Sequence, residues 1–157
     1  MGKEKLLALQ AESRYVFHGS PVLLEELTPR QPTITNMETG KQEGHGDPCV
    51  AATPLAEIAI FRAIVNPVNF PFRGYGSSFG VGPDGNPRFS VTEKVLRNLA
   101  GKIGYVYVFE RQGFSQFSEM EYRSAKAVKP IMAVAVSAED LPENIEVMVG
   151  PRPKTPR

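Results

Sequence analysis

The 157-residue chain is predicted to adopt an α+β fold with a split, mostly antiparallel β-sheet and a few helices. Strand-like segments do not alternate regularly with helical ones; instead, residues 104–109, 131–136 and 145–149 follow one another as consecutive strands. The hydrophobic content of 41% is typical of a globular protein, so the chain can bury a substantial core. We therefore expect a single domain over residues 1–157, with a helix in 1–12 and a loose tail at 151–157.

The first half of the chain contains two short strands and one well-marked helix. Residues 15–18 are apolar and β-favouring, and residues 49–52 have a similar character, so both are predicted to be buried strands. A helix over 54–64 follows, with Thr53 as N-cap and Pro54 in the first helical position. This helix is apolar on nearly all sides, which predicts packing on more than one face.

Glycine and proline, 14 of each, concentrate in the connections. They predict a loop of roughly twenty residues ending at Pro48 and an irregular segment over 69–87 with a turn at 83–87. A helix is expected at 91–100, with Ser90 and Glu93 as a capping box and Gly101 after its end. Residues 117–127 are expected to be extended, 131–136 to form the most buried strand, and Ser137 to cap a helical turn.

Composition argues against several classes of function. A net charge of +1 does not indicate electrostatic binding of nucleic acid or membranes. One cysteine, Cys49, and two histidines make neither a disulfide nor a convincing metal site, so no metal is expected. We find no phosphate-binding glycine loop, no serine-hydrolase motif, no signal peptide and no run of membrane-spanning length. We expect a cytoplasmic protein.

The main candidate for a binding site is the end of the first strand. Tyr15, Val16 and Phe17 run directly into His18, Gly19 and Ser20. A histidine, a glycine that permits close approach of the backbone and a hydroxyl group can together hold a small polar ligand. The alternative is a plain strand-to-turn transition whose histidine bonds a neighbouring carbonyl.

Three patches resemble the ADP-ribosyltransferase superfamily of the diphtheria-toxin and poly(ADP-ribose) polymerase type. Residues 17–20, Phe-His-Gly-Ser, resemble its first signature, a strand ending in His-Gly-(Ser/Thr). Residues 50–53 and the helix to Phe61 resemble the second, a strand and helix carrying aromatic residues. Residues 119–124, Glu-Met-Glu-Tyr-Arg-Ser, resemble the third, a glutamate at the start of a late strand. The patches cover about thirty residues in the order that the family has.

The resemblance implies that NAD is the substrate and that no metal is used. In the family, the histidine that corresponds to His18 bonds a ribose hydroxyl, and the residues that correspond to Gly19 and Ser20 hold the nicotinamide carboxamide. The position of Phe61 implies stacking on the nicotinamide ring. Glu121 is the first choice for the carboxylate that stabilises the oxocarbenium-like cation. Glu119 would lie on the same face of an extended segment and is the second choice.

The chain departs from the family at the first stacking tyrosine, where simple alignment places Val50. Tyr15 and the aromatic residues between Phe70 and Phe79 are candidates for the missing ring. Three classes of function therefore remain open: an NAD-dependent ADP-ribosyltransferase or NAD glycohydrolase, a catalytically silent relative that binds a nucleotide or a protein partner, and an unrelated α+β domain. The acceptor of ADP-ribose is not specified by the residues; a protein side chain is one possibility.

Overall fold

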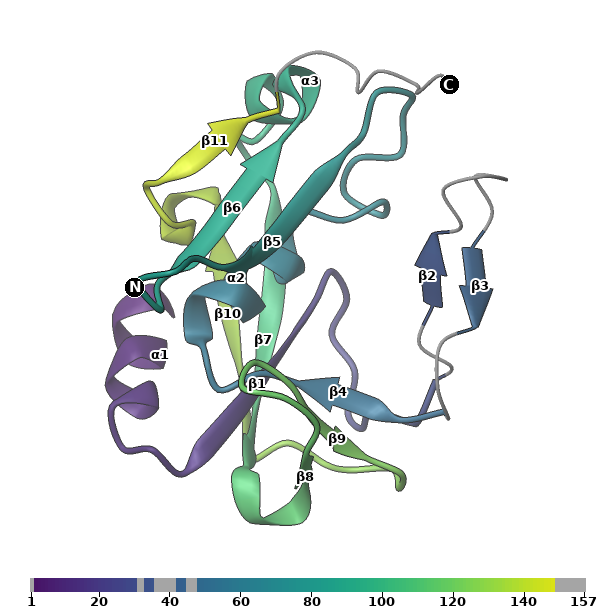
Figure 1. The fold of residues 1–157 in the computed structure, drawn as a ribbon, viewed down its shortest axis with the longest axis vertical. Helices are drawn as coiled ribbons and strands as arrows, with labels where there is room; N and C mark the ends of the chain where they lie inside the picture. Colours follow the sequence, from purple (N-terminus) through teal and green to yellow (C-terminus); the bar gives the residue numbers. More distant parts are fainter. Residues whose placement is uncertain (1, 31–32, 36–41, 45–47, 149–157) are drawn as a thin grey trace.

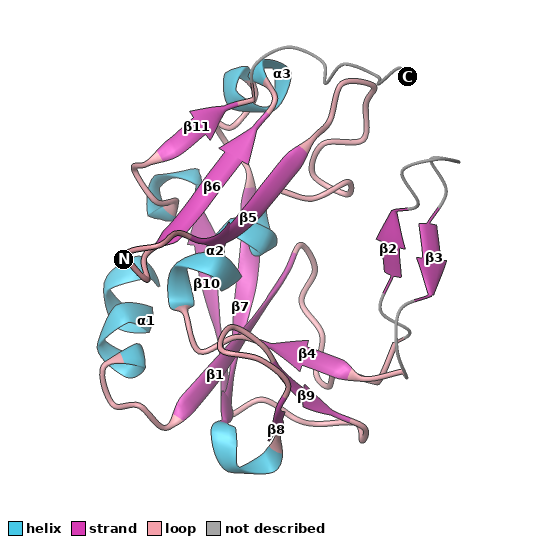
Figure 2. Cartoon of the chain, in the orientation of Figure 1, coloured by secondary structure: helices cyan, strands magenta, loops and turns pink. Residues whose placement is uncertain are grey.

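A computed structural model describes residues 2–30, 33–35, 42–44 and 48–148. It is a small α+β fold with open, mainly antiparallel sheets and few helices (Figures 1 and 2). This agrees with the fold class that the sequence predicts. Among the described residues, no helix has the length and apolar character needed to cross a membrane.

The central sheet has the strand order β1-β7-β10 and is antiparallel throughout. It consists of β1 (Tyr15–Ser20), β7 (Ile103–Glu110) and β10 (Met132–Ser137). The pairing of β1 with β7 confirms the predicted first strand, although the strand continues to Ser20 through residues that were expected to form a turn, and it places His18 opposite Tyr107. Burial on β10 alternates instead of being complete, so the expectation that it is the most buried strand was wrong. An edge strand keeps one face near solvent, whereas β7 lies between two neighbours.

Helix α2 (Ala56–Ile64) packs across β1 and β7, and seven of its residues are buried. A Cβ atom on Gly19 would lie 2.0 Å from the carbonyl oxygen of Ala59, and one on Gly104 would lie 2.2 Å from that of Ala63. Glycine at both positions therefore lets the helix backbone rest directly on the sheet. Packing on more than one side, as predicted, is completed by α1 (Gly2–Gln10), which also contacts α2.

Thr53 is not the N-cap of α2; that position is Leu55. The backbone of Thr53 instead pairs with Phe17 through hydrogen bonds of 2.7 and 2.8 Å. Its hydroxyl accepts a hydrogen bond from the Leu55 amide at 3.1 Å. Thr53 thus extends β4 (Val50–Ala52) toward β1 before the helix begins. The predicted helix is present, but it begins at Ala56 and not at Pro54, because Thr53 is paired with Phe17 of β1.

A second sheet has the order β11-β6-β5, formed by β5 (Ser77–Val81), β6 (Pro87–Val91) and β11 (Ile145–Val147). The irregular segment expected over 69–87 is regular from Ser77 onward, where the β5–β6 hairpin begins, and the predicted turn at 83–87 joins the two strands. Gly85 has φ +83° in this turn, a backbone conformation that glycine adopts more readily than other residues. Strand β11 pairs in parallel with β6 and so does not belong to the central sheet.

Helix α3 (Glu93–Arg97) is shorter than the predicted 91–100 helix. Ser90 belongs to β6, so the expected capping box does not form and Thr92 precedes the helix. A 3-10 turn, η2 (Ala138–Asp140), does have a capping box from Ser137 and Asp140, as the prediction of a capped turn requires.

A third sheet, with the order β4-β9-β8, contains β8 (Ser115–Gln116) and β9 (Tyr122–Ser124). The 3-10 turn η1 (Arg111–Gly113) leads into it from β7. Residues 117–127 are thus extended only in part. The predicted long loop that ends at Pro48 contains the antiparallel pair β2 (Thr33–Thr35) and β3 (Gln42–Gly44). Residues 31–32, 36–41 and 45–47 of that loop and the tail at 151–157 lie outside the described residues.

Candidate functional site

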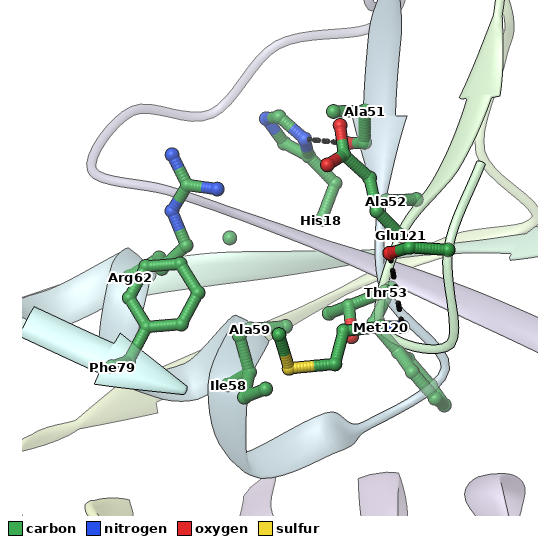
Figure 3. A pocket seen from close by; sticks show the side chains of 13 residues that line it. His18, Ala51, Ala52, Thr53, Ile58, Ala59, Arg62, Phe79, Met120 and Glu121 are labelled. Atoms are coloured by element: carbon green, nitrogen blue, oxygen red, sulfur yellow. Dashed lines mark hydrogen bonds between the residues drawn. The ribbon is translucent and has the colours of Figure 1, made fainter. Parts of the chain in front are cut away.

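A cavity of about 120 Å³ lies where β1, β4, α2 and the segment before β9 meet (Figure 3). The meeting of β1 and β4 follows from the Phe17–Thr53 pairing, and the close seating of α2 follows from Gly19. Its walls are formed by Phe17, His18, Gly19, Ala51, Ala52, Thr53, Ile58, Ala59, Arg62, Phe79, Ser118, Met120 and Glu121. His18, Gly19 and Glu121, which were selected from separate patches of the sequence, are therefore brought together.

His18 is half-buried and tied to the neighbouring strand β4. Its Nδ1 lies 2.6 Å from the carbonyl oxygen of Ala51. Since a carbonyl only accepts, Nδ1 carries the proton, and Nε2 is the acceptor in the neutral ring. Burial lowers the pKa of His18, the Ala51 bond opposes the shift, and the positive charges of Arg62 and Arg30 add to the lowering. At neutral pH the ring is thus uncharged and offers an acceptor at Nε2.

Gly19 lines the cavity, and its lack of a side chain is also required by α2, as described above. Ser20 does not line it. Ser20 is buried, and its Oγ accepts a hydrogen bond from the Val22 amide at 3.2 Å. The expected contribution of the serine hydroxyl to a ligand is therefore replaced by a local turn bond.

Glu121 lines the cavity and Glu119 does not. The amides of Phe117 and Ser118 donate to the Glu121 carbonyl at 2.9 and 3.0 Å, so the segment is a tight turn. The prediction that Glu119 and Glu121 share one face was wrong because it assumed extended chain, and Glu119 is exposed. The Glu121 carboxylate accepts a hydrogen bond from Nε of Arg123 at 2.7 Å, which fixes its orientation.

The expected stacking residues are not in the cavity. Phe61 is 1% exposed and packs against Phe89 with a ring-centroid distance of 4.9 Å, so it belongs to the core. Tyr15 is the first residue of β1, three positions before His18, where it is paired with Glu110, and it does not line the cavity. Val50, where the family has its tyrosine, is buried and does not line the cavity. The stacking roles inferred for Phe61 and Tyr15 do not fit this arrangement.

The aromatic side chain that borders the cavity from β5 is Phe79, which is 40% exposed. Sequence reasoning had placed it in an irregular loop, among several candidates for the missing ring. Arg62 was missed altogether. It follows Phe61 by one position, and a helix turns about 100° per residue, so these neighbours face different ways. The sequence feature that could have identified Arg62 is its charge, since the residues on either side of it in the helix, 58–61 and 63–64, are apolar.

Arg62 contributes a positive charge on the side of Phe79. Its guanidinium carbon lies 5.3 Å from the centroid of the Phe79 ring, a cation–π arrangement. Arg62 is exposed as a residue, yet the protein atoms around its guanidinium lower its pKa, and the Glu121 carboxylate opposes that shift. An arginine remains cationic at neutral pH despite such a shift.

The cavity therefore combines a neutral imidazole acceptor, a carboxylate, a guanidinium group and an exposed ring. Figure 3 shows Arg62 and Phe79 on one side, Glu121 on the other, and His18 between them. Such a set can bind a polar ligand that carries both hydroxyl and charged groups. Within the described residues, no three or more His, Cys, Asp or Glu side chains are grouped so that they could hold a metal ion.

No protein-family model, curated protein or solved structure matches the chain.

Proposed function

We propose that the chain is an NAD-dependent ADP-ribosyltransferase or NAD glycohydrolase, with the cavity as its NAD site. The observation that carries the proposal is that His18 and Glu121, far apart in the sequence, line one small cavity together with Gly19. These are the residues at which the chain resembles the ADP-ribosyltransferase superfamily. The convergence of these residues on one cavity supports the proposal.

In the proposed reaction, the bond between C1′ of the ribose and the nicotinamide nitrogen breaks. Its electron pair leaves with nicotinamide, which becomes neutral, and a cation develops on the ribose. The Glu121 carboxylate stabilises that cation, and Arg123 holds the carboxylate in place through the 2.7 Å bond. Water or an acceptor nucleophile then bonds to C1′ and releases a proton. The acceptor is proposed to be a small molecule or a protein side chain.

His18 is assigned the binding of NAD in the ground state. Its Nδ1–H is committed to Ala51, so Nε2 is available to accept a hydrogen bond from a ribose hydroxyl. The interaction is present before and during bond cleavage. Its loss therefore weakens binding more than it lowers turnover.

The experiment is a nicotinamide-release assay combined with calorimetric measurement of NAD binding. Glu121→Gln is expected to lower kcat by roughly a hundredfold with little change in Kd, because the charge acts mainly in the transition state. His18→Ala should raise Kd with little change in kcat. Glu119→Gln makes the same chemical change on an exposed residue outside the cavity and serves as the matched control. An equal loss of kcat in Glu121→Gln and Glu119→Gln would contradict the assignment of Glu121 as the catalytic carboxylate.

A silent nucleotide-binding relative is the second candidate. It is favoured by the absence of an aromatic residue in β4, where Ala51 and Ala52 line the cavity and Val50 is buried. Wild-type protein that binds NAD but releases no nicotinamide, with or without added acceptor proteins, would support this candidate over the enzyme.

A further inference from the structure

We infer that Arg62 binds a phosphate group of the ligand, so that the cavity selects phosphorylated nucleosides over nucleosides. The inference rests on the proposed function and deepens it by naming the substrate class. It assigns a binding role to a residue that neither the motif resemblance nor the expected chemistry of bond cleavage includes.

Arg62 is a cation without a salt bridge among the described residues. Its carboxylate neighbour Glu121 is hydrogen-bonded to Arg123 instead. The ring of Phe79 holds the guanidinium in position but does not neutralise its charge. A guanidinium group at a cavity, with its fork of donors uncommitted, matches the geometry and charge of a phosphate.

The size of the cavity supports a ligand that extends beyond it. A volume of about 120 Å³ accommodates roughly one ring, well below the 300–1,000 Å³ of sites for larger ligands. The remainder of a nucleotide must therefore lie at the cavity mouth.

The charges also fix the direction of the ligand. Arg62 and Glu121 lie on opposite sides of the cavity (Figure 3). NAD carries a positive pyridinium ring and negative phosphates. Attraction between Arg62 and a phosphate, and repulsion between Arg62 and the pyridinium ring, place the phosphate toward Arg62 and the ring on the side of Glu121.

The experiment compares three ligands by calorimetry: nicotinamide mononucleotide, nicotinamide riboside, which lacks the phosphate, and ADP-ribose, which lacks nicotinamide. Arg62→Gln is expected to weaken the two phosphorylated ligands by roughly 10- to 100-fold and to change riboside binding less than twofold. Arg62→Lys, which keeps the charge but not the fork, should show a smaller loss. Arg97→Gln on α3 removes an exposed arginine elsewhere and is the control.

Equal weakening of all three ligands by Arg62→Gln, or no weakening of ADP-ribose, overturns the inference. So does failure of wild-type protein to bind ADP-ribose. Nicotinamide release with unchanged KM in Arg62→Gln overturns the inference and leaves the proposed function standing. Arg62-dependent binding of ADP-ribose without any nicotinamide release supports the phosphate site and contradicts the proposed reaction.

Discussion

Replacement of Gly19 by alanine tests how closely α2 rests on β1. The added Cβ would lie 2.0 Å from the Ala59 carbonyl oxygen and 2.7 Å from the Ala63 amide nitrogen. An ordinary contact begins at 3.4 Å, so the helix must retreat by about 1.4 Å. Overpacking a core costs about 1–3 kcal/mol, and here the obstacle is backbone, which cannot rotate away. We therefore expect a loss of at least about 3 kcal/mol in the free energy of unfolding.

Thermal and urea unfolding measure this cost. For a chain of this length, about 3 kcal/mol lowers Tm by roughly 6–12 °C. Gly113→Ala is the matched control, because its Cβ meets nothing within 4 Å and its φ is not positive. It should be neutral or stabilise the protein by about 0.4–1 kcal/mol. A Gly19→Ala protein as stable as wild type would refute the direct packing of α2 on β1.

Three further predictions concern other residues. The pKa of His18 in the folded protein lies below its ordinary 6.5, so the unfolded chain takes up the proton first. The free energy of unfolding, measured by urea unfolding at several pH values, should therefore fall as pH drops below about 6.5. The fall should be smaller in His18→Asn. Phe61→Ala should lower the free energy of unfolding by about 3–5 kcal/mol, whereas Phe79→Ala should mainly weaken NAD binding, by about 0.5–1.5 kcal/mol. The reverse pattern would contradict the placement of Phe61 in the core and Phe79 at the cavity. Tyr107→Phe should cost about 1–3 kcal/mol in urea unfolding, because its hydroxyl bonds the Leu24 amide at 2.5 Å and the Val22 carbonyl at 2.7 Å.

Local patterns predicted three elements that build the core. Strands β1 and β7 and helix α2 were identified from continuous apolar runs and from the flanking residues. The burial of β10 could not be predicted in this way, since it depends on which strand is central and which is at the edge. The hairpin of β5 and β6 was missed because Ser-Ser-Phe-Gly-Val carries little β signal of its own.

The position of His18 could be inferred from the sequence, whereas the positions of other site residues depend on a rotation of the chain. His18 comes directly after the apolar residues that begin β1, which predicts that it lies at the edge of the core. The choice between Phe61 and Arg62 depends on helical phase, and one residue moves a side chain by about 100°. Glu119 lies outside the cavity because the chain forms a turn there, closed by hydrogen bonds to the Glu121 carbonyl. No sequence pattern predicted this turn.

The central claim is that NAD binds in the cavity bordered by His18 and Glu121. A crystal structure of the Glu121→Gln protein with NAD tests it most directly, because slow turnover preserves the bound dinucleotide. We predict nicotinamide in the cavity, a ribose hydroxyl within hydrogen-bonding distance of Nε2 of His18, and a phosphate beside Arg62. Density for NAD at another place on the protein, or an empty cavity at saturating NAD, would contradict the claim.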